Sequence, residues 1–344
     1  MTERPAPDTS EHTAPKTAMA GRPVLEVRDL TMHFPVKGSR NSVVHALDGV
    51  SFDLNPGETL GVVGESGCGK STMARCILRI YEPTSGSIYL NGVDITRLKQ
   101  KELRKHRSRM QMIFQDPHAS LDARMVVRDI IAEPLIAMGL RKSGKDAEDS
   151  VIDMLERVGL SREHAGRYPH EFSGGQLQRI GAARALILHP QAVVCDEPVS
   201  ALDVSIRAQL INMLKELQNG LGLSYIFISH DLSMVRYMAD RVAVMYLGQI
   251  VELCDGDAIY EAPLHPYTAG LLQAVPIADP RVARQKTQEA IGGDIASPVN
   301  PPHGCRFHTR CPYRSQICSQ QRPPLRDYGG GRLAACHFPL TPKL

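Results

Sequence analysis

With 344 residues, the sequence is long enough for a sizeable core and for more than one domain. Its net charge of +3 is nearly balanced, so the composition does not demand nucleic acid or an acidic membrane surface as a partner. No apolar run reaches the roughly 18 residues of a membrane-spanning helix, and the N-terminus lacks a signal pattern, which together predict a cytoplasmic protein. Residues 1–22 are rich in Pro, Thr and Ala, and we expect a disordered tail there.

The folded part is expected to begin at residue 23 with two strands. Val24–Val27 and Val43–Leu54 have strand-like composition, and the polar stretch Lys37–Ser42 predicts a loop between them. Phe34 lies on the approach to that loop, where it is placed to stack on an adenine ring. From its spacing alone, an ordinary core or loop aromatic explains Phe34 equally well.

The stretch Gly64–Thr72 follows the pattern G-x-x-x-x-G-K-S, with an apolar strand, Glu58–Val63, before it and a helical pattern, Ser71–Ile80, after it. Its glycines let backbone N–H groups curl around phosphate oxygens, and the positive end of the helix then holds the anion. The lysine can reach the terminal phosphates, and the serine hydroxyl can ligate Mg²⁺. A glycine turn that merely carries a lysine is the simpler alternative, but the flanking strand and helix favour nucleotide binding. The predicted nucleotide-binding residues are Gly64, Ser66, Gly67, Cys68, Gly69, Lys70, Ser71 and Thr72.

The next segments continue an α/β pattern and then become helical. Short strands are predicted at Ser87–Leu90 and Met110–Phe114. The most basic stretch, Arg97–Arg109, is interpreted as a solvated surface helix, because no aromatics interleave with its charges. Two stretches with helical periodicity follow: Val126–Leu140 and Asp146–Val158. We therefore expect a helical subdomain over residues of about 116–188, inserted into the α/β fold.

Acidic residues mark the end of the next buried strand. Ala192–Cys195 is apolar and runs directly into Asp196 and Glu197. Downstream of a phosphate loop, Asp196 is expected to hold Mg²⁺, directly or through water, and Glu197 to orient and deprotonate the attacking water. Two acids could also form a plain solvated turn. That alternative is weakened because a second apolar strand, Tyr225–Ser229, also ends in polar residues, the first of which, His230, can contact the terminal phosphate.

Between the phosphate loop and these acids lies Glu171–Gln176, with the sequence E-F-S-G-G-Q. This stretch resembles the signature motif of the ATP-binding cassette (ABC) ATPases. Four other elements of the family occur in the expected order along the chain. They are the A-loop aromatic Phe34, the Q-loop glutamine Gln115, the D-loop Ser200–Asp203 and the switch histidine His230. The resemblance covers about residues 24–275 and favours the adenine-stacking role of Phe34.

The resemblance also implies roles for these residues. The implied catalytic residues are Glu197, His230 and Gln115, and the implied Mg²⁺ ligands are Ser71, Gln115 and Asp196. The signature precedes a predicted helix, Gln176–Leu188, so that its amides and hydroxyl form a second phosphate site at a positive helix end. In the family, each signature closes over the phosphate loop of a second ATPase subunit in a head-to-tail pair. The residues expected to contact nucleotide in this way are Ser173, Gly174, Gly175, Gln176 and Asp203.

The C-terminal part narrows the resemblance to one branch. Phe172 within the signature, and the stretch His265–Thr268 (H-P-Y-T), are similar to the ATPases of dipeptide and oligopeptide importers. We therefore expect an ABC ATPase domain over residues 23–262 and an importer-type C-terminal extension over residues 263–344.

Four cysteines lie in that extension: Cys305, Cys311, Cys318 and Cys336. The stretch around them is rich in Pro and Gly, and such loops need something to tie them down. A reducing cytoplasm disfavours disulfides. Zn²⁺ suits four thiolates, but the short C-x-x-C spacing of structural zinc sites is absent. A [4Fe–4S] cluster tolerates wider spacing, and Cys311-Pro312 is similar to the Cys-Pro of ferredoxins. The family resemblance also implies this cluster, with Zn²⁺ as the alternative.

The other four cysteines are interpreted as structural. Cys68 is expected to face out of the phosphate loop, Cys76 and Cys195 to be buried, and Cys254 has no identifiable partner. Because we expect the phosphate loop to lie in a separately cored domain, we also expect ATP binding not to depend on the cysteines of the extension.

Together these features predict a P-loop α/β fold, with a RecA-like parallel sheet, an antiparallel β subdomain, a helical subdomain and a Cys-rich extension. The predicted function is the ATP-hydrolysing subunit of a dipeptide, oligopeptide or similar small-solute importer, peripheral on the cytoplasmic face of the membrane. The expected partners are a second, related ATPase subunit, two transmembrane permease subunits and an extracytoplasmic solute-binding protein, with no nucleic acid. The alternative is a soluble ABC ATPase that acts on ribosomes or DNA. The signature motif excludes a P-loop kinase or GTPase.

Overall fold

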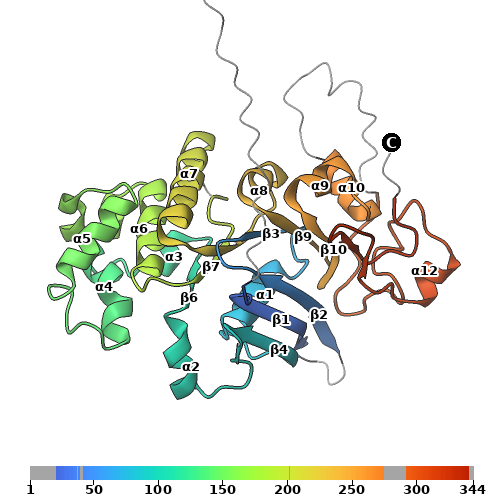
Figure 1. Cartoon of the computed structure of the whole chain (residues 1–344), viewed down its shortest axis with the longest axis horizontal. Coiled ribbons are helices and arrows are strands. Elements are labelled where there is room, and N and C mark those ends of the chain that lie inside the picture. Colours follow the sequence, from blue (N-terminus) through green and yellow to red (C-terminus); the bar gives the residue numbers. More distant parts are fainter. Residues whose placement is uncertain (1–20, 37, 39–41, 201, 275–291, 341–344) are drawn as a thin grey trace, which may run out of the picture.

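The computed structural model of the chain describes residues 21–36, 38, 42–200, 202–274 and 292–340 (Figure 1). The expected N-terminal tail, residues 1–22, lies almost entirely outside this range, as does Ala201 of the expected D-loop. No helix in these ranges is long and apolar enough to cross a membrane.

An eight-stranded sheet forms the centre of the molecule, in the order β11-β12-β10-β9-β3-β8-β7-β6. Five of its strands run parallel: β3 (Thr59–Val63), β6 (Met110–Ile113), β7 (Ala192–Asp196), β8 (Ser224–Ile228) and β9 (Arg241–Tyr246). Every residue of β3, β7 and β8 is buried. Such continuous burial is typical of parallel strands that are covered on both faces, and it explains why these strands read as unbroken apolar runs.

The other three strands of this sheet are antiparallel and reach into the C-terminal part of the chain. They are β10 (Gln249–Asp255), β12 (Leu333–Ala334) and β11 (Arg326–Asp327). In the pairing of β12 with β10, Ala334 lies opposite Glu252 and Leu333 opposite Leu253. Backbone pairing therefore helps to hold the extension, so the cysteines are not its only support.

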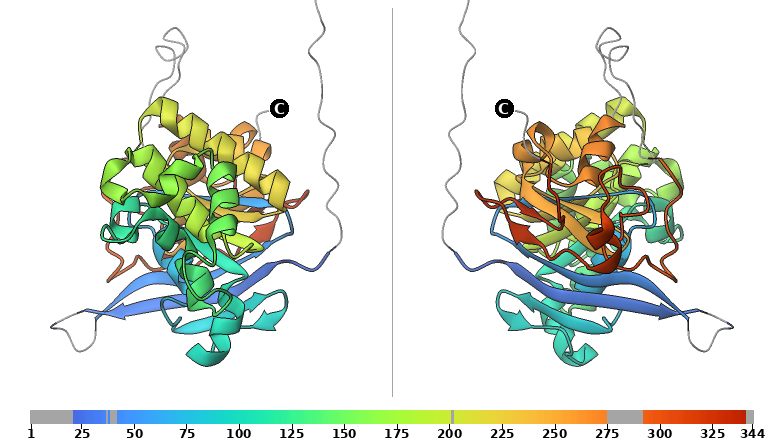
Figure 2. Two further views of the ribbon diagram at one scale, coloured as in Figure 1. Left: turned by 90° about the vertical axis from the view of Figure 1, so that its left-hand side faces the viewer. Right: turned by 90° about the vertical axis from the view of Figure 1, so that its right-hand side faces the viewer.

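A second, antiparallel sheet has the order β2-β1-β4-β5 and forms its own layer (Figure 2). Its strands are β1 (Leu25–Pro35), β2 (Val43–Leu54), β4 (Ser85–Leu90) and β5 (Val93–Asp94). The strand predicted at Val24–Val27 is longer than expected, because β1 stays paired with β2 as far as Pro35, through three shifts of register. Phe34 is therefore a residue of this strand, opposite Val44.

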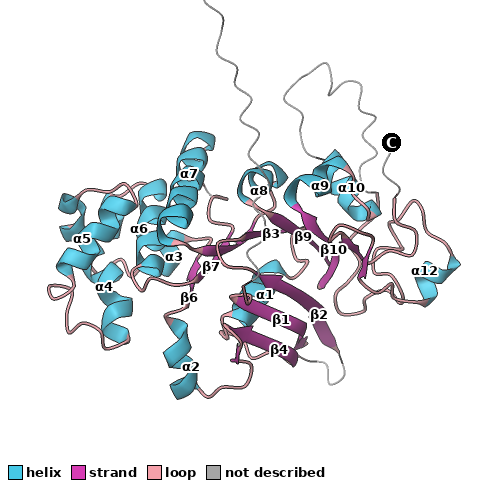
Figure 3. Ribbon diagram, viewed as in Figure 1, coloured by secondary structure: helices cyan, strands magenta, loops and turns pink. Residues whose placement is uncertain are grey.

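Helices gather at one end of the parallel sheet, as expected for the helical subdomain (Figure 3). They are α3 (Pro117–Ser120), α4 (Val127–Ala137), α5 (Glu148–Arg157) and α6 (Gly174–Leu186), with the short 3₁₀ turns Arg162–Gly166 and Pro169–Glu171. The basic stretch forms α2 (Gln100–Arg107), in which only Leu103 is buried, so it is a surface helix as predicted.

The other helices of the described residues lie after β3 and between or beyond the later strands of the main sheet. They are α1 (Lys70–Ile77), α7 (Val204–Leu221), α8 (Leu232–Met238), α9 (Gly256–Glu261), α10 (Pro266–Gln273) and α12 (Gln316–Gln320).

Two apolar cores lie on opposite faces of the main sheet. One contains Val62 and Ile226 with α1 and the antiparallel sheet. The other contains Tyr225 and the helical subdomain, and it also takes in Tyr267 and Phe307 from the C-terminal part of the chain. The extension thus shares a core with the ATPase domain, which contradicts the expectation of a separately cored phosphate-loop domain.

Candidate nucleotide-binding site

The phosphate loop connects β3 to α1 and has the backbone geometry that an anion site needs. Gly69, at the N-cap of α1, has φ +110°, and a Cβ there would lie 2.4 Å from the carbonyl oxygen of Ala46. Glycine is therefore required at this position. No side chain caps the helix, and the amides of its first turn have no intrahelical acceptor. These N–H groups can bind phosphate oxygens at the positive end of α1.

Lys70 crosses this loop from the first turn of α1. It is only 6% exposed, and its Nζ donates hydrogen bonds to the carbonyl oxygens of Gly64 at 2.7 Å and Glu65 at 3.0 Å. The ammonium is thus fixed along the inside of the loop, where it can neutralise the charge of bound phosphates.

Cys68 corrects one sequence-based expectation. Instead of facing out of the loop, its side chain is 4% exposed and turns inward, with Sγ 3.7 Å from Nζ of Lys70. Burial raises the pKa of this thiol, so it contributes packing rather than a reactive thiolate. The residue can offer only its backbone to a nucleotide.

The predicted magnesium ligands Ser71 and Asp196 are brought together across 125 residues of sequence. Ser71 Oγ donates a hydrogen bond to Asp196 Oδ1 at 3.0 Å. Asp196 ends β7 and is 3% exposed; burial raises the pKa of its carboxyl group, and the Ser71 hydrogen bond acts in the opposite direction. A hydroxyl beside a carboxylate at a phosphate loop is an oxygen-donor set suited to Mg²⁺.

The three predicted catalytic residues also meet, each from the loop that follows a different strand. Glu197 Oε2 lies 3.1 Å from Gln115 Nε2 and 3.4 Å from His230 Nδ1. Glu197 has φ +46°, an unusual conformation for a residue with a side chain, and its amide donates to the carbonyl of Ile228 at 3.0 Å. Backbone strain of this kind is found at functional sites, where neighbouring structure enforces it.

The signature residues lie elsewhere. Ser173 caps α6: its Oγ accepts from the amide of Gln176 at 3.4 Å, and Gln176 Oε1 accepts from the amide of Ser173 at 3.0 Å. Gly175 packs so closely on α7 that a Cβ would lie 2.5 Å from Cγ2 of Ile206. Among the described residues, no hydrogen bond or ion pair joins Ser173–Gln176 to the phosphate loop.

Two further predicted residues stand apart from this cluster. Asp203 is the N-cap residue of α7, but its side chain accepts no capping hydrogen bond. Phe34 packs edge-to-face on Tyr81, with ring centroids 5.5 Å apart, at the side of α1. Tyr81 was not singled out from the sequence, because a lone tyrosine after a helix has no distinguishing pattern.

Comparison with known proteins places this geometry in a family. Residues 47–200 match the family described as ABC transporter, and residues 251–318 match the oligopeptide/dipeptide transporter C-terminal region. The chain is similar to the oligopeptide transport ATP-binding protein AppF of Bacillus subtilis (strain 168), with 49% identity over 94% of this chain and 99% of AppF. It is also similar to OppF of Salmonella typhimurium, with 52% identity over 88% of this chain and 92% of OppF. The chain belongs to this family of ABC transporter ATPases.

Solved structures agree with this assignment. The dimeric post-hydrolysis state of the ATP-binding cassette MJ0796, bound to ADP and Pi, matches 67% of this chain and 98% of its own with a TM-score of 0.61 and 26% identity. The expected P-loop ABC ATPase fold is thereby confirmed. An ABC ATPase uses ATP and Mg²⁺, and the residues here fit both: an uncapped helix N-terminus and a buried lysine suit phosphates, and Ser71 and Asp196 offer oxygen atoms suited to Mg²⁺.

A second site gathers the four cysteines of the extension. Cys305, Cys311, Cys318 and Cys336 line one small pocket, together with His265, Phe307 and His308. The amide of Cys305 donates to the carbonyl of Cys318 at 2.8 Å, which holds these two segments side by side. None of the eight cysteines forms a disulfide in this structure. Burial, and to a lesser degree the neighbouring thiols, raise the pKa of both Cys305 and Cys336 to about 11.

Proposed function

We propose that this chain is the ATP-hydrolysing subunit of an importer for dipeptides, oligopeptides or a similar small solute. The observation that carries this proposal is the cluster in which Gln115, Glu197 and His230 meet beside Ser71 and Asp196. The transport direction and cargo class rest on the similarity to oligopeptide transport ATP-binding proteins and to the C-terminal region of their family.

In this proposal the loop amides and Lys70 hold the phosphates of ATP. Ser71, Asp196 and Gln115 would hold Mg²⁺, and the ion would supply positive charge to the transferring phosphoryl group. Glu197 orients the attacking water and accepts its proton, while His230 contacts the terminal phosphate. The strained backbone of Glu197 and the 3.1 Å contact with Gln115 keep the carboxylate aimed at one point.

A second ATPase subunit completes each site. The signature residues of this chain cap α6 and lie apart from its own phosphate loop. The amides of Ser173 and Gln176 are used in the capping box, which leaves the amides of Gly174 and Gly175 and the proton of the Ser173 hydroxyl for another nucleotide. In a head-to-tail pair, Ser173, Gly174, Gly175 and Gln176 of one subunit close over the ATP of its partner, and Asp203 lines the same interface. The partner ATPase is a related, non-identical chain.

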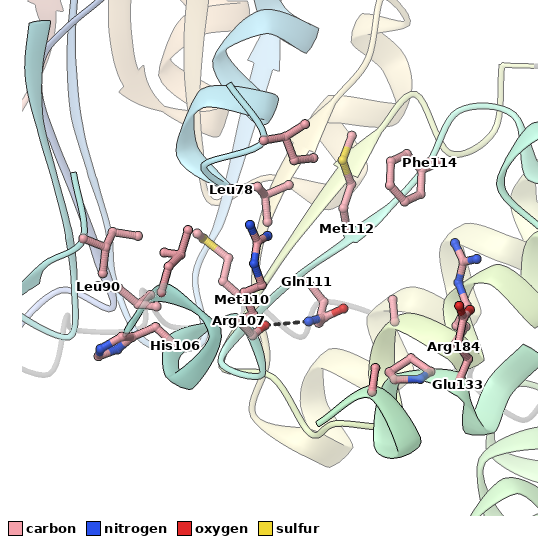
Figure 4. A pocket seen from close by; sticks show the side chains of 16 residues that line it. Leu78, Leu90, His106, Arg107, Met110, Gln111, Met112, Phe114, Glu133 and Arg184 are labelled. Atoms are coloured by element: carbon pink, nitrogen blue, oxygen red, sulfur yellow. Dashed lines mark hydrogen bonds between the residues drawn. The ribbon is translucent and has the colours of Figure 1, made fainter. Parts of the chain in front are cut away.

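A groove beside Gln115 is the contact surface for the permease subunits. It has a volume of about 300 Å³, and its walls come from α2, α4, α6 and β6 (Figure 4). Met110, Met112 and Phe114 form part of its apolar lining, and Phe114 immediately precedes Gln115. Gln178 of α6 donates to the carbonyl of Phe114 at 3.0 Å. A permease segment in this groove therefore senses both the helical subdomain and the Gln115 loop.

The four C-terminal cysteines hold a [4Fe–4S] cluster, with Zn²⁺ as the alternative. Tetrahedral zinc with Zn–S bonds of about 2.3 Å needs sulfur atoms about 3.8 Å apart. In the described ranges, only His33, His45 and Asp48 bring three candidate ligand atoms within 4.8 Å of one another. The thiols thus share a pocket but are more widely spaced than a single ion requires, which supports a larger group.

The proposed division of the chain follows from these sites. Residues 23–262 form the ABC ATPase domain, with its helical subdomain over about 116–188, and residues 263–344 form the cysteine-bearing extension. The assembled complex sits on the cytoplasmic face of the membrane and receives cargo from an extracytoplasmic solute-binding protein.

Purification of the native complex through a tag on this chain tests the proposal. In mild detergent, two apolar permease chains and a second ATPase should co-purify, and the complex in lipid vesicles should take up labelled oligopeptides when ATP is supplied. The same complex with Lys70→Ala is the matched control and should take up none. Recovery of ribosomes or DNA in place of permease chains would instead support a soluble ABC ATPase.

A further inference from the structure

One residue of the phosphate loop, Glu65, is held through all three of its polar groups. Its carbonyl oxygen accepts from Nζ of Lys70 at 3.0 Å, and its amide donates to the hydroxyl oxygen of Tyr267 at 2.9 Å. Its carboxylate pairs with both terminal nitrogens of Arg310, at 2.8 Å and 3.0 Å. Two of these three partners come from the C-terminal part of the chain, 202 and 245 residues away in sequence.

Arg310 is embedded rather than exposed. Its side chain is 5% exposed, and its guanidinium lies over the rings of Tyr246 and Phe307, about 6 Å from each centroid. The hydrogen bonds from its guanidinium to Glu65 raise the pKa of Arg310, so this group is permanently charged. The two rings also pack on Tyr267, so both contacts to Glu65 arise from one aromatic cluster.

A bidentate arginine–carboxylate pair in such surroundings fixes geometry strongly, because both hydrogen bonds must be kept parallel. Breaking it on one side leaves a largely buried charge without its partner. Any movement of Glu65 would also shift the carbonyl that anchors Lys70, and with it the ammonium that is proposed to bind the phosphates.

We propose that Arg310 is a positioning residue for ATP binding, which holds the phosphate loop in its nucleotide-binding shape through Glu65. Tyr267 supports the same residue from its amide side. The C-terminal extension therefore helps to maintain the conformation of the nucleotide site. The inference rests on the proposed role of the Gly64–Thr72 loop in binding nucleotide.

The test is the affinity of the purified full-length chain for a fluorescent ADP analogue with Mg²⁺, because ADP reaches the loop without being hydrolysed. Arg310→Ala should weaken binding about tenfold. Arg310→Lys should weaken it less, since it keeps the charge but loses the paired hydrogen bonds. Arg314→Ala is the matched control: this arginine lies in the same segment but is exposed, and its removal should leave the affinity unchanged.

A double-mutant cycle separates positioning from a general loss of stability. Glu65→Gln and Arg310→Gln should each weaken ADP binding, and the double variant should be no weaker than the worse single variant. Tyr267→Phe, a milder change, should weaken binding a few-fold and serves if the arginine variants do not fold.

Lys70→Ala shows whether a negative result refutes the role of Arg310 or the nucleotide site itself. If Lys70→Ala loses ADP binding while Arg310→Ala stays within twofold of the parent, the role of Arg310 is wrong and the nucleotide site stands. If Lys70→Ala binds ADP normally, the nucleotide site itself is wrong. Additive effects of Glu65→Gln and Arg310→Gln would also overturn the positioning role.

Discussion

At the scale of single residues, much of the arrangement of the candidate site could be predicted, because each residue type follows from what phosphate and Mg²⁺ require. Ser71 and Asp196 are in hydrogen-bond contact, and Gln115, Glu197 and His230 converge, although 125 residues separate the first pair and 82 separate Gln115 from Glu197. Their convergence is predictable from the order of the motifs along the chain and from the rule that sites form at the carboxyl ends of parallel strands.

Two residue-scale features were not predictable. Cys68 was expected to face outward but is buried, because its direction depends on how the loop closes over Lys70. The partners of Glu65 were missed, because a tyrosine and an arginine more than 200 residues downstream have no spacing that relates them to a phosphate loop.

The first prediction concerns Lys70. Lys70→Ala should weaken ATP binding by about tenfold or more, because it removes a charge-assisted contact to the phosphates. Calorimetric titration of the purified chain with ATP measures this directly. Lys215→Ala is a suitable control, since Lys215 of α7 donates to the carbonyl of Tyr237 in α8 and not to the phosphate loop. An affinity equal to that of the parent would show that Lys70 does not contact phosphate.

At the scale of elements, the sequence predicts the bounds of strands and helices well where their apolar pattern is strong. β7 is one residue longer than the predicted strand, and β8 is shifted by one residue at each end, because an apolar run that is buried on both faces leaves little ambiguity. β1 was predicted too short, because its outer half is only partly buried and is defined by pairing with β2. The two-residue strand β12 carried no sequence signal at all.

The second prediction concerns the N-terminus of α6 and its proposed role in closing over the partner's nucleotide. Ser173→Arg should leave the chain's own nucleotide binding intact but block closure over the partner's nucleotide, because a bulky cation replaces the capping hydroxyl at the helix N-terminus. When the variant is paired with the unaltered partner ATPase, only the site that faces the altered signature should stop hydrolysing ATP.

Trapping of radiolabelled nucleotide measures this prediction. The two sites can be told apart because their phosphate loops belong to two different chains. Ser161→Arg provides the control, since Ser161 also caps a helical turn, Arg162–Gly166, but lies outside the signature. Equal loss of activity at both sites would mean that the head-to-tail arrangement, or the independence of its sites, is wrong.

At the scale of the whole molecule, the extension is more firmly integrated than the sequence suggested. Phe307 is buried in the core that also holds the helical subdomain, and Arg306 bonds to Asp48 of β2 and to the carbonyl of Leu247. Composition alone could not reveal this, because scattered aromatic and basic residues in a Pro- and Gly-rich stretch carry no periodic pattern.

The cysteine pocket gives a prediction at this scale. If the four thiols hold a [4Fe–4S] cluster, protein purified without oxygen should be brown and contain about four irons per chain. Cys336→Ser should lose or degrade the cluster, whereas Cys254→Ser, which lies outside the pocket on β10, should keep it. Metal analysis and the visible absorption spectrum measure both. A colourless protein with one tightly bound zinc would refute the cluster but keep the metal site.

The most direct test of the whole account is ATP turnover and dimerisation of Glu197→Gln. This variant should bind ATP normally, hydrolyse it more slowly by a factor on the order of 10² or more, and accumulate ATP-bound dimers, because the general base is lost while the closed pair still forms. Glu156→Gln, on the exposed face of α5, should behave as the parent does. Normal hydrolysis by Glu197→Gln, with no ATP-stabilised dimer, would contradict the assignment of the base and of the site built around it.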